Sequence, residues 1–149
     1  MCPVLSPDGV TFLCDHAKAP VWAIPSALDF MRRATAKRKI IILGTLSDYI
    51  EDRNPTYARV ASQALGVADY VFFVGRWASR CLRAKRHAED HALQAFVTVD
   101  HINQFLKGFL EPGDLVLLKG SGHTDQLSRI VSAWSSKPQG RSVDVHPDL

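Results

Sequence analysis

Short apolar runs alternate with longer stretches of helical periodicity along this chain, and that alternation most constrains its fold. Five apolar runs of five residues lie at positions 10–14, 39–43, 70–74, 95–99 and 114–118. The segments that follow them have helical patterns, at 22–37, 54–66, 76–86, 100–110 and 126–134. Strands that alternate with helices predict a parallel sheet covered on both faces. We therefore expect an α/β domain with a Rossmann-like, mostly parallel sheet of five or six strands and helices on both faces.

The segment 22–43 shows both patterns in succession. Ile24, Ala27, Leu28 and Met31 recur at spacings of three and four residues, which predicts one buried face of a helix. Proline at position 25 fits only the first turn of that helix. The run 39–43 (KIIIL) is continuously apolar after its first residue and ends at a glycine, which is typical of a strand buried on both faces.

A length of 149 residues fits one domain. We expect a linker at 1–9, the domain at 10–134 and a flexible tail at 135–149, because the tail is rich in serine, proline and glycine. The three cysteines show neither metal-ligand spacing nor a disulfide framework, which favours a reducing compartment. No apolar run reaches membrane-spanning length and the first residues do not resemble a signal peptide, so we expect a cytoplasmic protein.

In parallel sheets of this kind, ligands bind outside the carboxyl ends of the strands. The turn at 15–20 (DHAKAP) follows the first predicted strand and carries Asp15 and Lys18. A carboxylate can accept hydrogen bonds from ribose hydroxyls, and a lysine supplies a positive charge for phosphate. The alternative for this turn is structural, with Asp15 capping the turn and Lys18 solvated.

The loop at 119–125 (KGSGHTD) follows the last predicted strand. Its two glycines let backbone N–H groups approach an anion, and Ser121 and His123 can form hydrogen bonds. The alternative is an ordinary glycine turn with a helix cap. The loop lacks P-loop spacing, no GxGxxG follows the first strand, and a dehydrogenase is therefore poorly supported.

Two further groups of residues were considered as sites. The basic residues gather on the predicted helix at 76–86, and form either a solvated helix face or a docking surface for phosphate or a partner. The histidines at 87 and 91 would stand one helical turn apart, but no third metal ligand is evident, so we expect no metal site.

Four segments in order resemble the C-terminal domain of the Mur ligase family, which also includes folylpolyglutamate synthases. They are GVTFLCDHAKAPVWAIPSALDFM, KIIILGTLSDY, ADYVFFVG and EPGDLVLLKGSGHTDQLSRIV. The last is the clearest, and its PGD-apolar-KGS pattern is most similar to the ligases that add D-alanyl-D-alanine to the UDP-N-acetylmuramoyl-tripeptide. The loop GSGHT half matches the GKGHE loop of the diaminopimelate-adding branch, and residues 75–78 replace its DNPR motif.

The resemblance implies an ATP-dependent amide ligase of peptidoglycan precursor synthesis. In this family ATP phosphorylates a substrate carboxylate and an incoming amine attacks the acyl phosphate. By resemblance, Asp15 contacts the ribose and Lys18 faces the nucleotide. The residues implied for the incoming amino acid or peptide are Lys119, Ser121, His123 and, from its place after the third strand, Arg76.

The family's P-loop domain and sugar-nucleotide domain have no counterpart in this sequence. ATP and magnesium would therefore be bound mainly by a central ATPase domain and an N-terminal substrate domain outside it, and we expect no activity from the chain alone. The alternative hypothesis is a non-catalytic nucleotide-binding or protein-docking module of the same fold, with the basic segment at 76–86 as its contact surface.

Overall fold

Six strands form one sheet in the computed structural model, which describes residues 1–135. The spatial order is β1-β2-β6-β3-β4-β5, and every neighbouring pair is parallel except β1 with β2. The strands are β1 (Cys2–Leu5), β2 (Thr11–Asp15), β3 (Arg38–Leu43), β4 (Tyr70–Val74), β5 (Leu93–Phe96) and β6 (Asp114–Lys119). The expected mostly parallel α/β architecture is confirmed.

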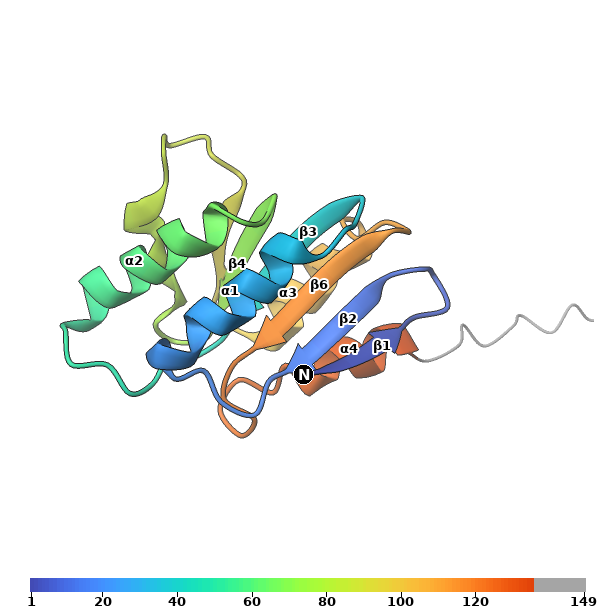
Figure 1. Cartoon of the computed structure of the whole chain (residues 1–149), viewed down its shortest axis with the longest axis horizontal. Coiled ribbons are helices and arrows are strands. Elements are labelled where there is room, and N and C mark those ends of the chain that lie inside the picture. Colours follow the sequence, from blue (N-terminus) through green and yellow to red (C-terminus); the bar gives the residue numbers. More distant parts are fainter. Residues whose placement is uncertain (136–149) are drawn as a thin grey trace, which may run out of the picture.

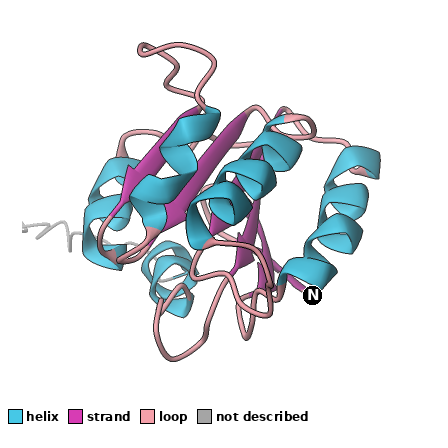
Figure 2. Cartoon of the chain, turned by 90° about the vertical axis from the view of Figure 1, so that its left-hand side faces the viewer, coloured by secondary structure: helices cyan, strands magenta, loops and turns pink. Residues whose placement is uncertain are grey.

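The helices cover both faces of this sheet. Figure 1 shows α1 and α2 in front of it and α3 and α4 behind it, and Figure 2 shows the same layers from the side. Their bounds, with two 3₁₀ helices, are η1 (Val21–Ala23), α1 (Ile24–Arg33), α2 (Arg53–Leu65), η2 (Ala78–Ala84), α3 (Val99–Lys107) and α4 (Ser128–Ser135). No helix within residues 1–135 has the length and apolar character needed to cross a membrane.

Each face of the sheet has its own hydrophobic core, because successive side chains of a strand point to opposite faces. Ile41 of β3 packs with the buried face of α1 and with α2, whereas Ile40 and Ile42 pack with α3 and α4. The helical face predicted for 22–37 is confirmed: Ile24, Ala27, Leu28 and Met31 are the buried residues of α1, and the proline lies in its first turn.

An ion pair anchors the starts of β3 and β6. Arg38 donates to both oxygens of Asp114, at 2.8 and 2.6 Å, and also to the carbonyl of Phe109. The Asp114 side chain is fully buried, and the hydrogen bond with this carboxylate raises the pKa of the Arg38 guanidinium. A bidentate pair of this kind fixes the register of two strands that lie 76 residues apart in sequence.

Several sequence boundaries need correction. The expected linker at 1–9 contains β1, an edge strand that pairs antiparallel with β2 and sets Cys2 opposite Cys14. The expected basic helix at 76–86 is only η2, since the chain turns after Ala84. The tail expected from 135 lies, apart from the last residue of α4, outside the described residues.

Helix α3 begins at a threonine cap. Thr98 is its N-cap, and the Thr98 hydroxyl accepts a hydrogen bond from the His101 N–H. Asp100 lies in the first turn and pairs with Arg129 of α4. A threonine oxygen at the N-cap satisfies one of the free N–H groups of the first turn.

Candidate functional site

Three loops meet at the carboxyl edge of the sheet, where β2, β6 and β3 lie side by side. They are the turn after β2 (15–20), the loop after β3 (44–52) and the loop after β6 (119–125). The sequence predicted the first and third as ligand-binding segments. The structure brings them together because β6 is inserted between β2 and β3.

Asp15 and Lys119 form an ion pair at the centre of this edge. The parallel register of β2 and β6 sets the two residues side by side, and Lys119 Nζ lies 2.7 Å from Asp15 Oδ2. The ammonium also donates to the carbonyl oxygen of Lys18 at 3.3 Å. The Lys119 side chain is 5% exposed and that of Asp15 is 31% exposed, so the carboxylate is the accessible member of the pair. The Lys18 residue is itself exposed.

The buried carboxylate of Asp125 holds two of the loops together. Its Oδ2 accepts hydrogen bonds from the N–H groups of Thr45, at 2.7 Å, and Ser121, at 2.6 Å. Its Oδ1 accepts from the Thr45 hydroxyl at 2.6 Å. A Cβ on Gly44 would overlap this carboxylate, so glycine at the end of β3 is required by close packing. Asp125 thereby sets the shape of the loop that carries Ser121.

Tyr57 of α2 forms a hydrogen bond with the backbone of the loop after β3. Its hydroxyl oxygen accepts a hydrogen bond from the Leu46 N–H at 3.1 Å, and its ring contacts Phe73. Burial raises the pKa of Tyr57 to about 12, so the phenol stays neutral at physiological pH. The same loop is tied to the turn after β2, because Ser47 N–H donates to Ala19 O and Ser47 O accepts from Val21 N–H.

The turn after β2 and the loop after β6 are also joined directly. The N–H of Gly122 donates to the carbonyl of Ala17 at 3.1 Å. Ser121 is partly buried, and its hydroxyl accepts a hydrogen bond from the Thr124 N–H. His123 is exposed on the same loop. Of the predicted residues, Asp15, Lys18, Lys119 and Ser121 thus gather at one place, with His123 on its rim.

Arg76 lies on the neighbouring turn, directly after β4, in a cluster around one indole ring. The guanidinium carbons of Arg53, Arg76 and Arg80 lie 3.6, 4.6 and 5.8 Å from the centroid of Trp77. Gly75, which precedes Arg76, lies beside the Asp125 carboxylate and the Thr45 hydroxyl. Three cations on one aromatic ring make this turn a place where an anionic group would be attracted.

The chemistry of the edge suits a hydroxyl-rich, anionic ligand better than a metal ion. Within residues 1–135 no group of three or more His, Cys, Asp or Glu side chains is placed to hold a metal. The histidines at 87 and 91 follow η2 in a segment without helix, so they do not form the one-turn pair considered from the sequence. By contrast, His16 Nδ1 is buried without a hydrogen-bond partner in the described part of the chain, beside Asp15.

Sequence reasoning missed the residues that organise the site. Asp125 ends the predicted loop at 119–125, and Thr45 follows the glycine after the predicted strand at 39–43, but nothing in the sequence spacing indicates that the Asp125 carboxylate bonds both segments. Trp77 and Arg53 come from different elements and meet only through the packing of η2 on α2. The sequence did carry one signal for Asp125. Gly44 directly follows β3 and Gly120 directly follows β6, and a glycine at such a position can indicate a neighbour that leaves no room for a side chain. That neighbour is the Asp125 carboxylate.

The chain is similar to known proteins in both its sequence and its fold. The family model described as "Mur ligase, glutamate ligase domain" matches residues 2–122. A comparison with curated proteins gave no match.

Solved structures share the fold at low sequence identity. A crystal structure of MurF from Acinetobacter baumannii matches with a TM-score of 0.76 and 18% identity over 91% of this chain and 29% of that one. MurF ligase from Thermotoga maritima in complex with ADP matches with a TM-score of 0.70 and 17% identity over 89% of this chain and 29% of that one. E. coli FolC in complex with ADP matches at 0.58 and 21% identity, over 87% of this chain and 30% of that one. The chain spans less than a third of the length of these three proteins.

Proposed function

Because the chain belongs to the Mur ligase family, as its glutamate ligase domain, we propose that it forms the C-terminal part of an ATP-dependent amide ligase. The ligase would join an amino acid or peptide to a peptidoglycan precursor in the cytoplasm. The observation that carries this proposal is the meeting of three loops at the carboxyl edge of the sheet, held by Asp125 and by the Asp15–Lys119 pair. That edge is where ligands of such sheets bind.

Asp15 is our candidate for the ribose contact. Its Oδ2 is occupied by Lys119, whereas its Oδ1 has no protein partner within residues 1–135 and can accept a hydrogen bond from a sugar hydroxyl. The unpartnered His16 Nδ1 adds a second polar atom beside it. Lys18 is exposed on the same turn and supplies a positive charge toward the phosphates. These residues fit a nucleotide, and two of the structural relatives are described as ADP complexes.

For Lys119 the geometry favours a different role from the one the resemblance implied. Its ammonium is buried and already donates to Asp15 and to the Lys18 carbonyl. The Lys119 ammonium is positively charged and has donors only, so it does not attract an incoming amino group, and its ion pair holds the Asp15 carboxylate in place. We therefore assign Lys119 as a positioning residue that orients Asp15. Ser121 and His123 remain the candidates for the incoming amine substrate, and Arg76 for its carboxylate.

ATP bound with magnesium would supply the phosphoryl group that activates the acceptor carboxylate. By resemblance to the family, the magnesium and most phosphate contacts would lie on the P-loop domain of the intact ligase. This chain would close over the nucleotide, orient the incoming amine and exclude water from the reacting groups.

Calorimetry tests the proposal. ATP with magnesium is titrated into the chain alone, into a separately purified Mur-type P-loop domain, and into their mixture. We expect tighter ATP binding in the mixture than with either domain alone, and a weaker gain with the Asp15→Ala variant. The exposed Asp29→Ala on α1 is the matched control and should behave as the wild type.

One result would contradict the ligase assignment, and another would contradict the role of Asp15. Tight ATP binding to the chain alone, unchanged by the P-loop domain, would favour the non-catalytic nucleotide-binding module instead. Identical binding by the wild type and Asp15→Ala in the mixture would remove Asp15 from the nucleotide site, even if the ligase assignment stands.

A further inference from the structure

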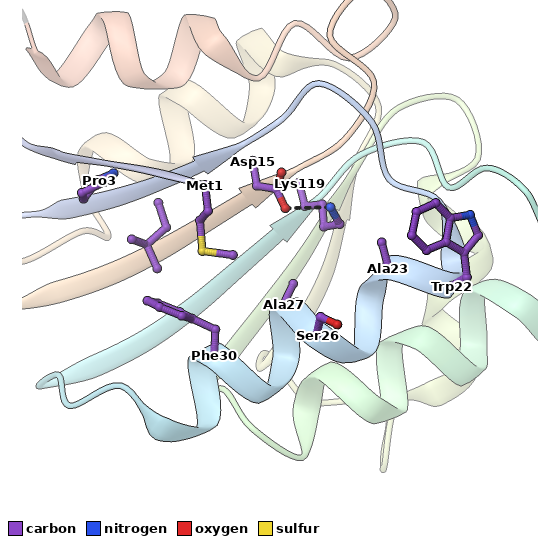
Figure 3. A pocket seen from close by; sticks show the side chains of 10 residues that line it. Met1, Pro3, Asp15, Trp22, Ala23, Ser26, Ala27, Phe30 and Lys119 are labelled. Carbon is purple, nitrogen blue, oxygen red and sulfur yellow. Dashed lines mark hydrogen bonds and ion pairs between the residues drawn. The ribbon is translucent and has the colours of Figure 1, made fainter.

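A cavity lies on the α1 face of the sheet, beside the edge that carries the proposed site. Its volume is about 730 Å³. On this face α1 and α2 cover the middle of the sheet, whereas β1 and β2 have no helix in front of them (Figure 1). The cavity fills the angle between those two strands and α1, as Figure 3 shows.

Its walls are mainly apolar. Leu13 of β2 and Ala27 of α1 form the inner surface, and Phe30 and Met1 stand on opposite sides of the opening (Figure 3). Phe30 is 49% exposed and Trp22, farther along the same wall, is 73% exposed. A flat apolar molecule can pack on large aromatic side chains that border a cavity and remain exposed.

The polar end of the cavity is the Asp15–Lys119 pair. The Lys119 ammonium has three N–H donors, of which one bonds Asp15 and one bonds the Lys18 carbonyl, so one is left. Asp15 Oδ1 is likewise without a partner in residues 1–135. The pair is neutral as a whole and presents one donor beside one acceptor. A carboxamide group carries the complementary acceptor and donor side by side.

We propose that this cavity binds a small, uncharged molecule with an aromatic or branched apolar body and a carboxamide-type head. The head bonds the free N–H of Lys119 and the free oxygen of Asp15, while the body packs between Phe30 and Leu13. A volume of about 730 Å³ falls within the range of small-molecule sites. A carboxylate or ammonium head is disfavoured, because it would meet a like charge in the pair. The head would use the same oxygen, Asp15 Oδ1, that is proposed above for the ribose, so the two ligands would exclude each other.

Titration of the ¹⁵N-labelled chain with naphthalene-2-carboxamide, followed by amide chemical shifts, tests this site. We expect saturable shifts confined to the α1 wall and the ends of β2 and β6. Ser26→Phe places a ring in the cavity from its exposed rim and should weaken binding tenfold or more. Ser62→Phe makes the same change on the exposed surface of α2, away from the cavity, and should bind as the wild type.

Ligand variants test the chemistry of the head. Naphthalene-2-carboxylate and acetamide should each bind at least tenfold more weakly than the carboxamide, the first for its charge and the second for its missing body. Equal binding by the Ser26→Phe variant, or equal binding of the carboxylate, would overturn the proposal. Adenosine should displace the carboxamide, because both ligands would bond Asp15 Oδ1, and a lack of competition would count against the ribose contact but not against this site.

Discussion

Replacing Asp125 by alanine should destabilise the protein more than any surface charge substitution on the same edge. The change leaves the N–H groups of Thr45 and Ser121 without their acceptor, while the Thr45 hydroxyl can rotate to another partner. Each partly buried donor left unsatisfied costs about 1.5 kcal/mol, which gives about 3 kcal/mol for the pair. For a domain of this size, about 3 kcal/mol corresponds to a fall in Tm of about 9 °C.

Differential scanning calorimetry of matched variants measures this. Asp100→Ala removes a carboxylate from the exposed pair with Arg129 and should lower the Tm by no more than about 3 °C, since exposed ion pairs contribute at most about 1 kcal/mol. Asp125→Asn retains one acceptor oxygen and should fall between the two. In hydrogen exchange, the amides of Thr45 and Ser121 should lose protection in Asp125→Ala while those of β3 keep theirs.

The reasoning would be refuted by equal Tm values for Asp125→Ala and Asp100→Ala. Equal values would mean that water replaces the carboxylate at no cost, and that the loops after β3 and β6 hold their shape without it. Loss of exchange protection throughout the sheet would refute the local role in another way, because it would make Asp125 part of the global core.

Three further outcomes follow from the packing. Gly44→Ala should lower the Tm by displacing the carboxylate beside it, whereas Gly108→Ala, where a Cβ meets nothing within 4 Å, should leave it unchanged or raise it slightly in the same scan. Arg38→Ala leaves the buried Asp114 carboxylate unpaired and should cost about 3 kcal/mol or more in urea unfolding; a loss below about 1 kcal/mol would show that solvent reaches that carboxylate. Tyr57→Phe should be less stable than the wild type at pH 7, because the Leu46 N–H loses its acceptor. The pKa of Tyr57 is about 12 in the folded protein, above its ordinary value of 10. Between these two pH values the folded wild type keeps the phenol proton while the unfolded chain loses it, so the free energy of unfolding of the wild type falls as pH rises above about 10. The difference in free energy of unfolding between the wild type and Tyr57→Phe should therefore narrow between pH 10 and 11. A constant difference would contradict the burial of the phenol.

The elements of this fold could be predicted from the sequence because each depends on local pattern. The buried residues of α1 recur at helical spacing, and the continuous apolar run of β3 is typical of a strand covered on both faces. The edge strand β1 was missed, since CPVL is short and contains a proline that fits an unpaired edge but weakens a strand signal. The helix at 76–86 was overestimated because its charged residues mimic a solvated helical face, while the backbone forms only a 3₁₀ segment.

The site was predicted in its location but not in its connections. Asp15 and Lys119 were given separate ligands, since 104 residues separate them and no local signal reveals the order of strands. The register of β2 with β6 makes them partners. Asp125 had no predicted role for the same reason: its three hydrogen bonds join loops that become neighbours only once the sheet is assembled.

The position of β6 also governs when the molecule can fold. This strand is the last within residues 1–135, yet it lies between β2 and β3 and pairs with both. A growing polypeptide that ends before Asp114 can form only two separate pieces, the β1–β2 hairpin and the β3–β4–β5 sheet, each with one unpaired inner edge. Exposed strand edges pair with other chains. During synthesis the half-made domain is therefore most open to aggregation just before residues 114–119 appear, and their arrival closes both edges in a single step.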